Sequence, residues 1–558
     1  MLLVLLAWGI ISLIFLSLGN TLISLWNTLL KKTDRFSIFD TFWIGLCFTG
    51  TLLLVISLLF PINIYILALF AGYAILYFVF NYRKVRVYTS TIKSYFKANT
   101  LWGNIAFLSV FLVVLSFSLE APMLGDYGLY HQQTMMWTEQ YSVVPGLGNI
   151  HGRLGFNSSF FLLTTLFSYH PDTYPLFYPL NSLCLLVLSL WLISRIKKDT
   201  SFVHILGILG IFCCILIFFK ILIPSSATDF LPGFMVCYIL LSCITSDKDI
   251  ESRSLPLFIM SAFCITLKLS SFSILFVPII IVILLFKSRD FKVIYFLVAL
   301  GAVIFIPWCL RFVIQTGYLV YPFPSVDLFS FDWKIPINLV QEERDWVYSW
   351  SRIPKRPAAE VLALPFTEWF SIWMKGQEPK TLAIFLLAII SPLFLYFTSS
   401  FAERRRIYTI LGIALCGIIY CLTTAPDLRF AFGFVFVAAF VPFWSYNRKH
   451  NMRINKYATK GILVLFYIFS TLCIWNGLKR AKYFHEGFVF SPVFYQTNYC
   501  NNGIDSDPTG IKELIINNIT IYIPKSDQCF GQCLPCTPYP KEGLEMRGQT
   551  FQDGFRIR

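Results

Sequence analysis

Charged residues are scarce in this chain of 558 residues: Asp, Glu, Lys and Arg together make up 13% of it, against 57% hydrophobic residues. With a mean hydropathy of +0.68, this composition excludes a soluble globular protein. The sequence also lacks a Walker-type phosphate loop, a GxGxxG dinucleotide motif and an HExxH zinc motif. Nucleotide chemistry in the cytosol is therefore unsupported. No internal repeat of fixed period and no low-complexity segment stands out.

Long apolar runs are what the sequence has instead. Stretches close to the length needed to cross a bilayer recur, and they predict an all-α polytopic membrane protein with about 14 transmembrane helices. The predicted membrane domain covers residues 1–477. Its first run, Leu2 to Leu30, has neither an early positive charge nor a small-residue cleavage pattern, so we expect a retained helix and not a signal peptide. The apolar stretch 159–168 is too short to cross and is expected at the interface.

Lys and Arg in short loops indicate the orientation. Basic clusters occur near residues 31–35, 83–97, 195–198, 287–292, 404–406 and 448–460. With the predicted spans all of them fall on one face, which the positive-inside rule makes cytoplasmic. The opposite face then receives the loops 120–174 and 316–379 and the tail from residue 478. Much of the net charge of +15 follows from this topology, so no nucleic-acid partner is predicted.

The tail, residues 478–558, is expected to form a small extracytoplasmic cap. It contains Cys500, Cys529, Cys533 and Cys536, in "NYCNNG" and "DQCFGQCLPC". An even number of cysteines in an oxidising compartment favours disulfides, and four cysteines allow three connectivities between which the sequence does not choose. The alternative is a metal site built from the same thiolates. The outward topology favours disulfides.

Polar residues that the spans do not explain collect on the outer side. "LEAPMLGDYGLYHQQ" follows a predicted span and contains Glu120, Asp126, Tyr130 and His131. On a continuing helix the last three would share one face. A helix-capping role would explain Asp126 alone, but not the polar run beside it. We therefore favour a functional cluster, with Arg153 among the further polar groups that the same loop makes available.

Charges also lie at the outer ends of later spans. Lys268 stands in "CITLKLSSF", Arg311 in "CLRFVIQTG", and Asp427 and Arg429 in "TTAPDLRFAF". Ionisable groups at such depth are costly and usually face a cavity or a partner. Together they predict a cationic cavity that opens outward and suits a phosphate or pyrophosphate headgroup.

At two places the residues carry a resemblance. "GDYGLY" supplies Asp126 and Tyr130 after a span, with Tyr127 where Glu is common. This arrangement resembles the first outer loop of the GT-C superfamily of integral-membrane glycosyltransferases, which includes protein O-mannosyltransferases and lipid A aminoarabinose transferases. A second segment, "LRFVIQTGYLVYPF", is similar to an Arg…Thr-Gly…Tyr-Pro segment of such proteins. Its matching residues are Arg311, Thr316, Gly317, Tyr321 and Pro322. The tail looks like that of an uncharacterised bacterial polytopic membrane family.

The resemblance implies a GT-C-like fold in the bacterial inner membrane, with interfacial helices in the first large outer loop. It implies transfer of a sugar or glycan, with inversion, from a polyprenyl-phosphate or polyprenyl-diphosphate donor to an acceptor glycan, lipid or protein outside the cytoplasm. Asp126 would be the general base, and Glu120, Tyr130, His131, Lys268, Arg311, Asp427 and Arg429 would contact substrate.

Cofactor use and function class both stay open at this point. Some members of the superfamily use a divalent metal ion held by several acids, whereas the first outer loop of this chain offers only Glu120, Asp126 and Asp172, so a metal ion is not firmly implied. Two other kinds of protein also fit many spans with polar outer loops. One is a polymerase or ligase of lipid-linked polysaccharide, and the other is a non-enzymatic flippase or transporter of lipid-linked sugars, which would place polar groups near the bilayer midplane.

Overall fold

A computed structural model of the chain is mostly helical. It describes residues 1–558 with the exception of 99–100, 121–124, 169–176, 197–201, 246–248, 399–400, 446–455, 486–511, 517–518 and 532.

Eight segments of the described chain are helical, long and apolar enough to cross a membrane. They are α1 (Leu2–Leu30), α2 (Ile38–Ile56), α9 (Phe202–Phe219) with η4 (Lys220–Leu222), η6 (Leu269–Leu275) with α12 (Phe276–Lys287), α13 (Phe291–Thr316), α17 (Pro379–Thr398), α18 (Phe401–Thr424) and α20 (Lys456–His485). The pair α3 (Ile64–Phe80) and α4 (Tyr82–Ala98) passes the same test but is bent by 86°. The chain is therefore a multi-pass membrane protein.

Shorter helices complete the bundle. They are α5 (Leu101–Phe117), α8 (Pro179–Ile193), α10 (Phe230–Thr245), α11 (Ser254–Leu267) with η5 (Glu251–Arg253), and α19 (Leu428–Ser445). These helices are shorter than the roughly 20 residues that a straight span needs. The predicted total of about fourteen spans is consequently not confirmed by length and composition.

Small residues bring the first two helices into close contact. A side chain at Gly19 would overlap the backbone carbonyl of Thr41, and one at Gly45 would overlap the backbone of Phe15. Since lipid tails are as apolar as the helices, close van der Waals packing of this kind is what holds membrane helices together. At one end of the bundle Asp40 of α2 accepts hydrogen bonds from Arg253 and Tyr238, both at 2.8 Å.

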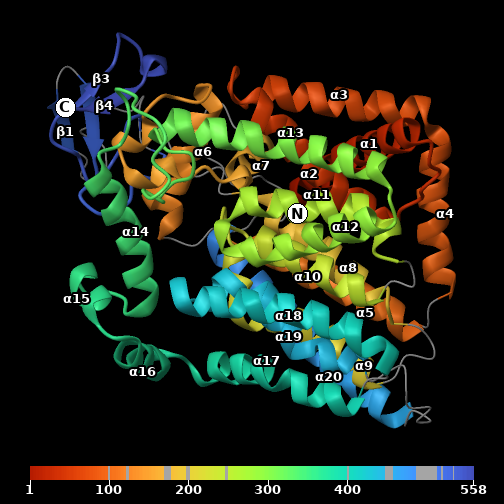
Figure 1. The fold of residues 1–558 in the computed structure, drawn as a ribbon. Helices are drawn as coiled ribbons and strands as arrows, with labels where there is room; N and C mark the ends of the chain where they lie inside the picture. The colour runs from red at the N-terminus through yellow and green to blue at the C-terminus, as the bar shows by residue number, and fades with distance from the viewer. Residues whose placement is uncertain are drawn as a thin grey trace.

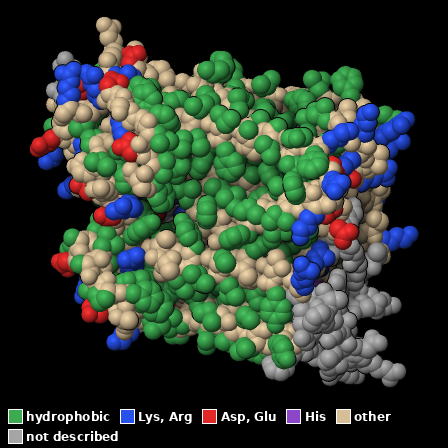
Figure 2. All heavy atoms as spheres, in the orientation of Figure 1, with side chains coloured by type: hydrophobic (Ala, Val, Ile, Leu, Met, Phe, Trp, Pro, Cys, Tyr) green, Lys and Arg blue, Asp and Glu red, His purple; other side chains and the backbone are tan. Residues whose placement is uncertain are grey.

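The non-membrane elements gather at one end of the bundle, which we call the loop end (Figure 1). They are η1 (Tyr127–His131), α6 (Gln132–Gln140), η2 (Leu147–Asn149), η3 (Gly152–Gly155), α7 (Ser159–Phe167), α14 (Ile337–Arg352), α15 (Ala358–Ala363) and α16 (Phe366–Gly376). Helix α4 lies at the opposite end. Between the two ends the surface is a broad hydrophobic band, and Lys, Arg, Asp and Glu concentrate outside it (Figure 2).

The C-terminal cap also lies at the loop end. It contains two antiparallel pairs, β1 (Lys512–Ile516) with β2 (Ile519–Ile523) and β3 (Leu544–Met546) with β4 (Phe555–Ile557), and a short turn η9 (Phe551–Asp553). The Phe555 N–H donates to the Pro145 carbonyl at 2.9 Å, and Arg547 pairs with Asp332 at 2.8 Å. The cap is thus attached to both of the large loops, while the predicted boundary between residues 477 and 478 stays a prediction.

Candidate functional site

Asp126 begins a short irregular helix at the loop end. Gly125 adopts a φ of 106°, which glycine tolerates and other residues rarely adopt. The following residues Tyr127–His131 form a π-helix, a conformation often found at functional sites. Asp126 occupies the N-cap position, but its side chain makes no capping hydrogen bond. The Asp126 carboxylate therefore does not cap this helix and is available for contacts with other side chains or with a ligand.

That carboxylate lies between two arginines. Asp126 Oδ1 is 3.0 Å from Arg153 Nη1, and Oδ2 is 3.9 Å from Arg429 Nη1. Arg429 is also held by Asp427, at 2.9 Å from its Nε. The Asp126 side chain keeps 42% of its surface exposed, so solvent or a ligand can reach it. Figure 2 shows a hollow on the same end of the molecule, with charged side chains at its rim.

Lys268 provides the third cation of this cluster. It stands at the break between α11 and η6 and forms an ion pair with Asp229. Its Nζ lies 4.1 Å from the centre of the Phe430 ring, and the Arg429 guanidinium lies 4.8 Å from the same ring. One aromatic side chain therefore keeps the two cations next to each other.

Glu343 contributes an acid that the sequence did not single out. It belongs to α14, and its Oε1 is 3.4 Å from Arg153 Nε. A side chain at Gly152 would come within 2.6 Å of Glu343 Oε2, so this glycine permits the approach of α14. Arg153 also covers the ring of Tyr130, at 5.4 Å. Arg153 therefore connects Asp126, Tyr130 and Glu343.

Burial and charge determine the protonation of this cluster. Burial raises the pKa of Asp126, but nearby positive charges, those of Arg153 and Arg429 among them, lower it, and the net result is below the ordinary 3.8. Burial lowers the pKa of His131 to about 4, and the ring lies 3.1 Å from Ser226 Oγ. Burial raises the pKa of Glu343 despite the charge of Arg153. At neutral pH Asp126 is therefore ionised and His131 is neutral.

The structure brings most of the predicted site residues together. Asp126, Tyr130, His131, Lys268, Asp427 and Arg429 all belong to this cluster. Glu120 does not join it through any contact of the described residues, because its carboxylate pairs with Arg480 of α20 at 3.1 Å. Arg311 makes a separate set of contacts, to Asn157 and Ser57. The roles predicted for Glu120 and Arg311 in substrate binding stay predictions.

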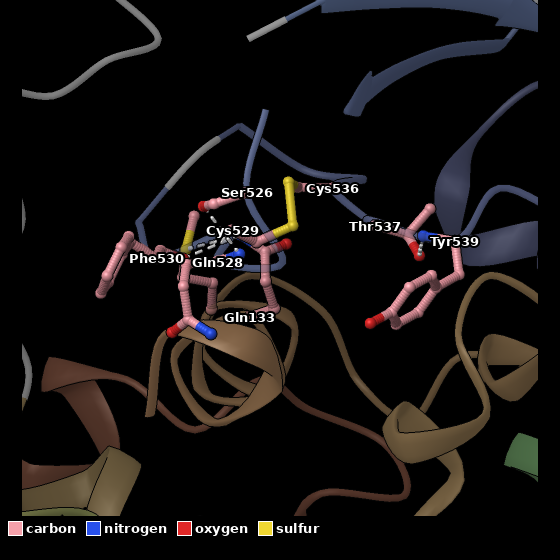
Figure 3. Close-up of a disulfide and its surroundings, with 9 residues drawn as sticks. Gln133, Ser526, Gln528, Cys529, Phe530, Cys536, Thr537 and Tyr539 are labelled. Carbon is pink, nitrogen blue, oxygen red and sulfur yellow. Dashed lines mark hydrogen bonds between the residues drawn. A yellow bond between two sulfur atoms is a disulfide. The ribbon is translucent and has the colours of Figure 1, made fainter. Parts of the chain in front are cut away.

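The cap packs against the helix that follows Asp126, and Figure 3 shows Gln528 and Phe530 of the cap next to Gln133 of α6. The Phe530 N–H donates to the Gly128 carbonyl at 2.8 Å, and Gln133 Nε2 donates to the Phe530 carbonyl at 3.1 Å. Phe530 follows Cys529, which forms a disulfide with Cys536. This confirms a disulfide in the tail, and it removes two of the four thiolates that a metal site would need.

The other two tail cysteines are placed less completely. Cys533 is also disulfide-bonded, and Cys500 lies outside the described residues. Across the described part of the chain no group of three or more His, Cys, Asp or Glu side chains is placed to hold a metal ion.

The chain belongs to the family described as a domain of unknown function, DUF8201, whose model matches residues 1–436. Neither a curated protein nor a solved structure matches the chain. The matched range includes the whole Asp126 cluster, up to Arg429, whereas the cap lies beyond it.

Proposed function

We propose that this member of the DUF8201 family is a GT-C-type membrane glycosyltransferase with about fourteen spans. It would move a sugar or glycan, with inversion, from a polyprenyl-phosphate or polyprenyl-diphosphate donor to an acceptor on the extracytoplasmic face of the bacterial inner membrane. The observation that carries the proposal is the Asp126 carboxylate, which is ionised, partly exposed and free of any capping hydrogen bond.

The residues of the cluster suit the two chemical requirements of this reaction: removal of the acceptor proton and stabilisation of the leaving phosphate. The acceptor hydroxyl oxygen attacks the anomeric carbon, its proton passes to Asp126, and the bond from that carbon to the phosphate oxygen breaks. The electron pair of the broken bond stays on the phosphate. Lys268 and Arg429, which share the Phe430 ring, would stabilise this developing charge. Asp427 orients Arg429 by its 2.9 Å contact.

Donor binding would also strengthen the base. In the free protein the pKa of Asp126 is lowered by the cations around it. A donor phosphate that pairs with Arg429 and Lys268 would neutralise part of this charge and add a negative charge nearby. Both effects raise the pKa of a carboxylate, and a general base works best when its pKa approaches the working pH. The long 3.9 Å contact of Arg429 to Asp126 is the one that a phosphate would most easily replace.

Asp126→Asn tests the proposal, because asparagine keeps the size of the side chain but cannot take the proton. We expect release of polyprenyl phosphate from a polyprenyl-phosphate-hexose probe, in vesicles that contain the purified protein, to fall by about 10²–10⁴-fold. Asp327→Asn is the matched control, since Asp327 lies in the other large loop and pairs with Lys334. A folded Asp126→Asn protein that releases polyprenyl phosphate at a near-normal rate would refute the assignment. Unchanged movement of the probe across the membrane, without release, would favour the transporter instead.

A further inference from the structure

Arg311 is buried and has no anionic partner among the residues that the structure describes. Only 5% of its surface is exposed, and it lies in α13 near the loop end. Its Nε donates to Asn157 Oδ1 at 2.9 Å and its Nη1 to Ser57 Oγ at 2.6 Å, and both partners are neutral. Within the described part of the chain, no carboxylate lies within ion-pair distance of this guanidinium, and Nη2 makes no hydrogen bond. The positive charge of Arg311 is thus left without compensation.

Arg253 shows what the same fold does elsewhere with a buried arginine. It is 6% exposed, and its Nη2 lies 2.8 Å from Asp40 Oδ1. A buried charge that has lost its partner is strongly destabilising, and ionisable groups in membrane segments usually pair with one another. The contrast indicates that Arg311 is compensated by something that is not part of the described chain.

A small pocket lies beside Arg311. It is formed where the ends of α2 and α13 meet the segment after α6, and its lining includes Ser57, Trp137, Gln315 and Tyr141. Two side chains of this lining each carry a buried polar atom, Trp137 Nε1 and Gln315 Oε1, that has no hydrogen-bond partner among the described residues. The empty volume of about 250 Å³ includes space open to the outside, and the enclosed part fits only a group of about the size of a water molecule.

We propose that this pocket binds a small anion, or a single anionic oxygen of a larger ligand, held by Arg311 and the indole N–H of Trp137. The Gln315 amide completes the set, because rotation about its last bond presents its NH₂ group to the ligand. An anion would neutralise the buried guanidinium and accept a hydrogen bond from the Trp137 indole N–H, which is otherwise unsatisfied. Hydrogen bonds with a charged partner are about twice as strong as neutral ones. The site is distinct from the Asp126 cluster and does not depend on the proposed transferase activity.

A purified full-length protein in neutral detergent allows a direct test. At constant ionic strength, replacement of gluconate by chloride or phosphate should raise the Tm by about 3 °C, and the rise should saturate. If the anion belongs to a lipid, micelles doped with phosphatidylglycerol but not with phosphatidylcholine should give the rise, and free anions should not. A Tm that responds to neither free anions nor the anionic lipid would overturn the proposal.

Two substitutions assign the response to this pocket. Trp137→Phe keeps an aromatic ring at this position but removes the indole N–H, so the anion concentration at half-effect should rise about tenfold. Arg311→Met should abolish the response. Arg253→Met is the matched control, because it destabilises the protein by leaving Asp40 unpaired but keeps the anion response. A response that persists unchanged in both Arg311→Met and Trp137→Phe would place the anion elsewhere and refute the site.

Discussion

Gly128→Ala should detach the cap from the π-helix. A methyl group on Gly128 would lie 2.5 Å from the Phe530 ring and would also overlap the Gln528 side chain. Gly128 is not among the residues with a positive φ, so the backbone itself can accept alanine. The clash therefore acts on the contact between the cap and the π-helix, and relief of the clash requires the loop around Phe530 to move away.

The expected magnitude follows from the contacts that such a movement breaks. Overpacking costs about 1–3 kcal/mol. Phe530 makes one hydrogen bond with Gly128 of the π-helix and one with Gln133 of α6, and each contributes about 1 kcal/mol. Because part of the strain is relieved when the bonds break, we expect cap docking to weaken by about 2–4 kcal/mol. This corresponds to an increase of about 30- to 900-fold in the population with the cap released.

Trypsin cleavage after Arg547 and Arg556 measures this population, since both side chains pair with Asp332 of the 316–379 loop while the cap is docked. Where opening is fast relative to cleavage, the cleavage rate follows the open population. Gly412→Ala is the matched control, because nothing lies within 4 Å of the added carbon in α18. In a double-mutant cycle, Phe530→Ala should remove most of the effect of Gly128→Ala. A Gly128→Ala protein that is cleaved at the wild-type rate would show that this contact does not hold the cap.

Two further predictions concern orientation and pH. Cysteines introduced into the 120–174 and 316–379 loops and into the cap should react with a membrane-impermeant maleimide from outside the cell, and labelling of the basic loops instead would invert the orientation. Because the pKa of Asp126 is lowered, the base stays ionised as the pH falls, so kcat/KM should be flat from pH 7 down to the ordinary carboxyl range. It should decline only below about pH 3.8, and an acid limb near pH 6 in kcat/KM would contradict the assignment.

Local sequence patterns predict the helices, because helix formation depends mainly on residues that are close in sequence. The run Leu2–Leu30 corresponds to α1, and the short apolar stretch 159–168 corresponds to α7 outside the candidate spans. The π-helix at Tyr127–His131 was not predicted, because periodicity alone does not distinguish a π-turn from an α-helix. The polar cluster around Asp126 was predicted only in outline, since each residue was identified by its position at the end of a span.

The sequence does not identify Glu343 as a member of the site, because Glu343 comes from a distant part of the chain. Glu343 reaches Arg153 only because α14 folds back over η3. In sequence it is one acid among several in "QEERD", and no local rule distinguishes the one that faces inward. The separation of Arg311 from the Asp126 cluster is equally invisible in sequence, because both stand near outer span ends. Side-chain partners between segments are set by tertiary packing, which a single sequence does not display.

The contact between Gln133 and Phe530 spans 397 residues of the chain, and this separation has a consequence for biosynthesis. At typical elongation rates of about 5–20 residues per second, the ribosome needs about 20–80 s to make the intervening chain. Throughout that interval the π-helix and the buried Gln132 and Gln133 of α6 have been made, but the cap that packs on them has not. The newly made membrane part must therefore persist as an incomplete intermediate, exposed to proteases and to wrong partners, until the end of the chain arrives. Ribosome-stalled chains that end before Gln528 would isolate this intermediate.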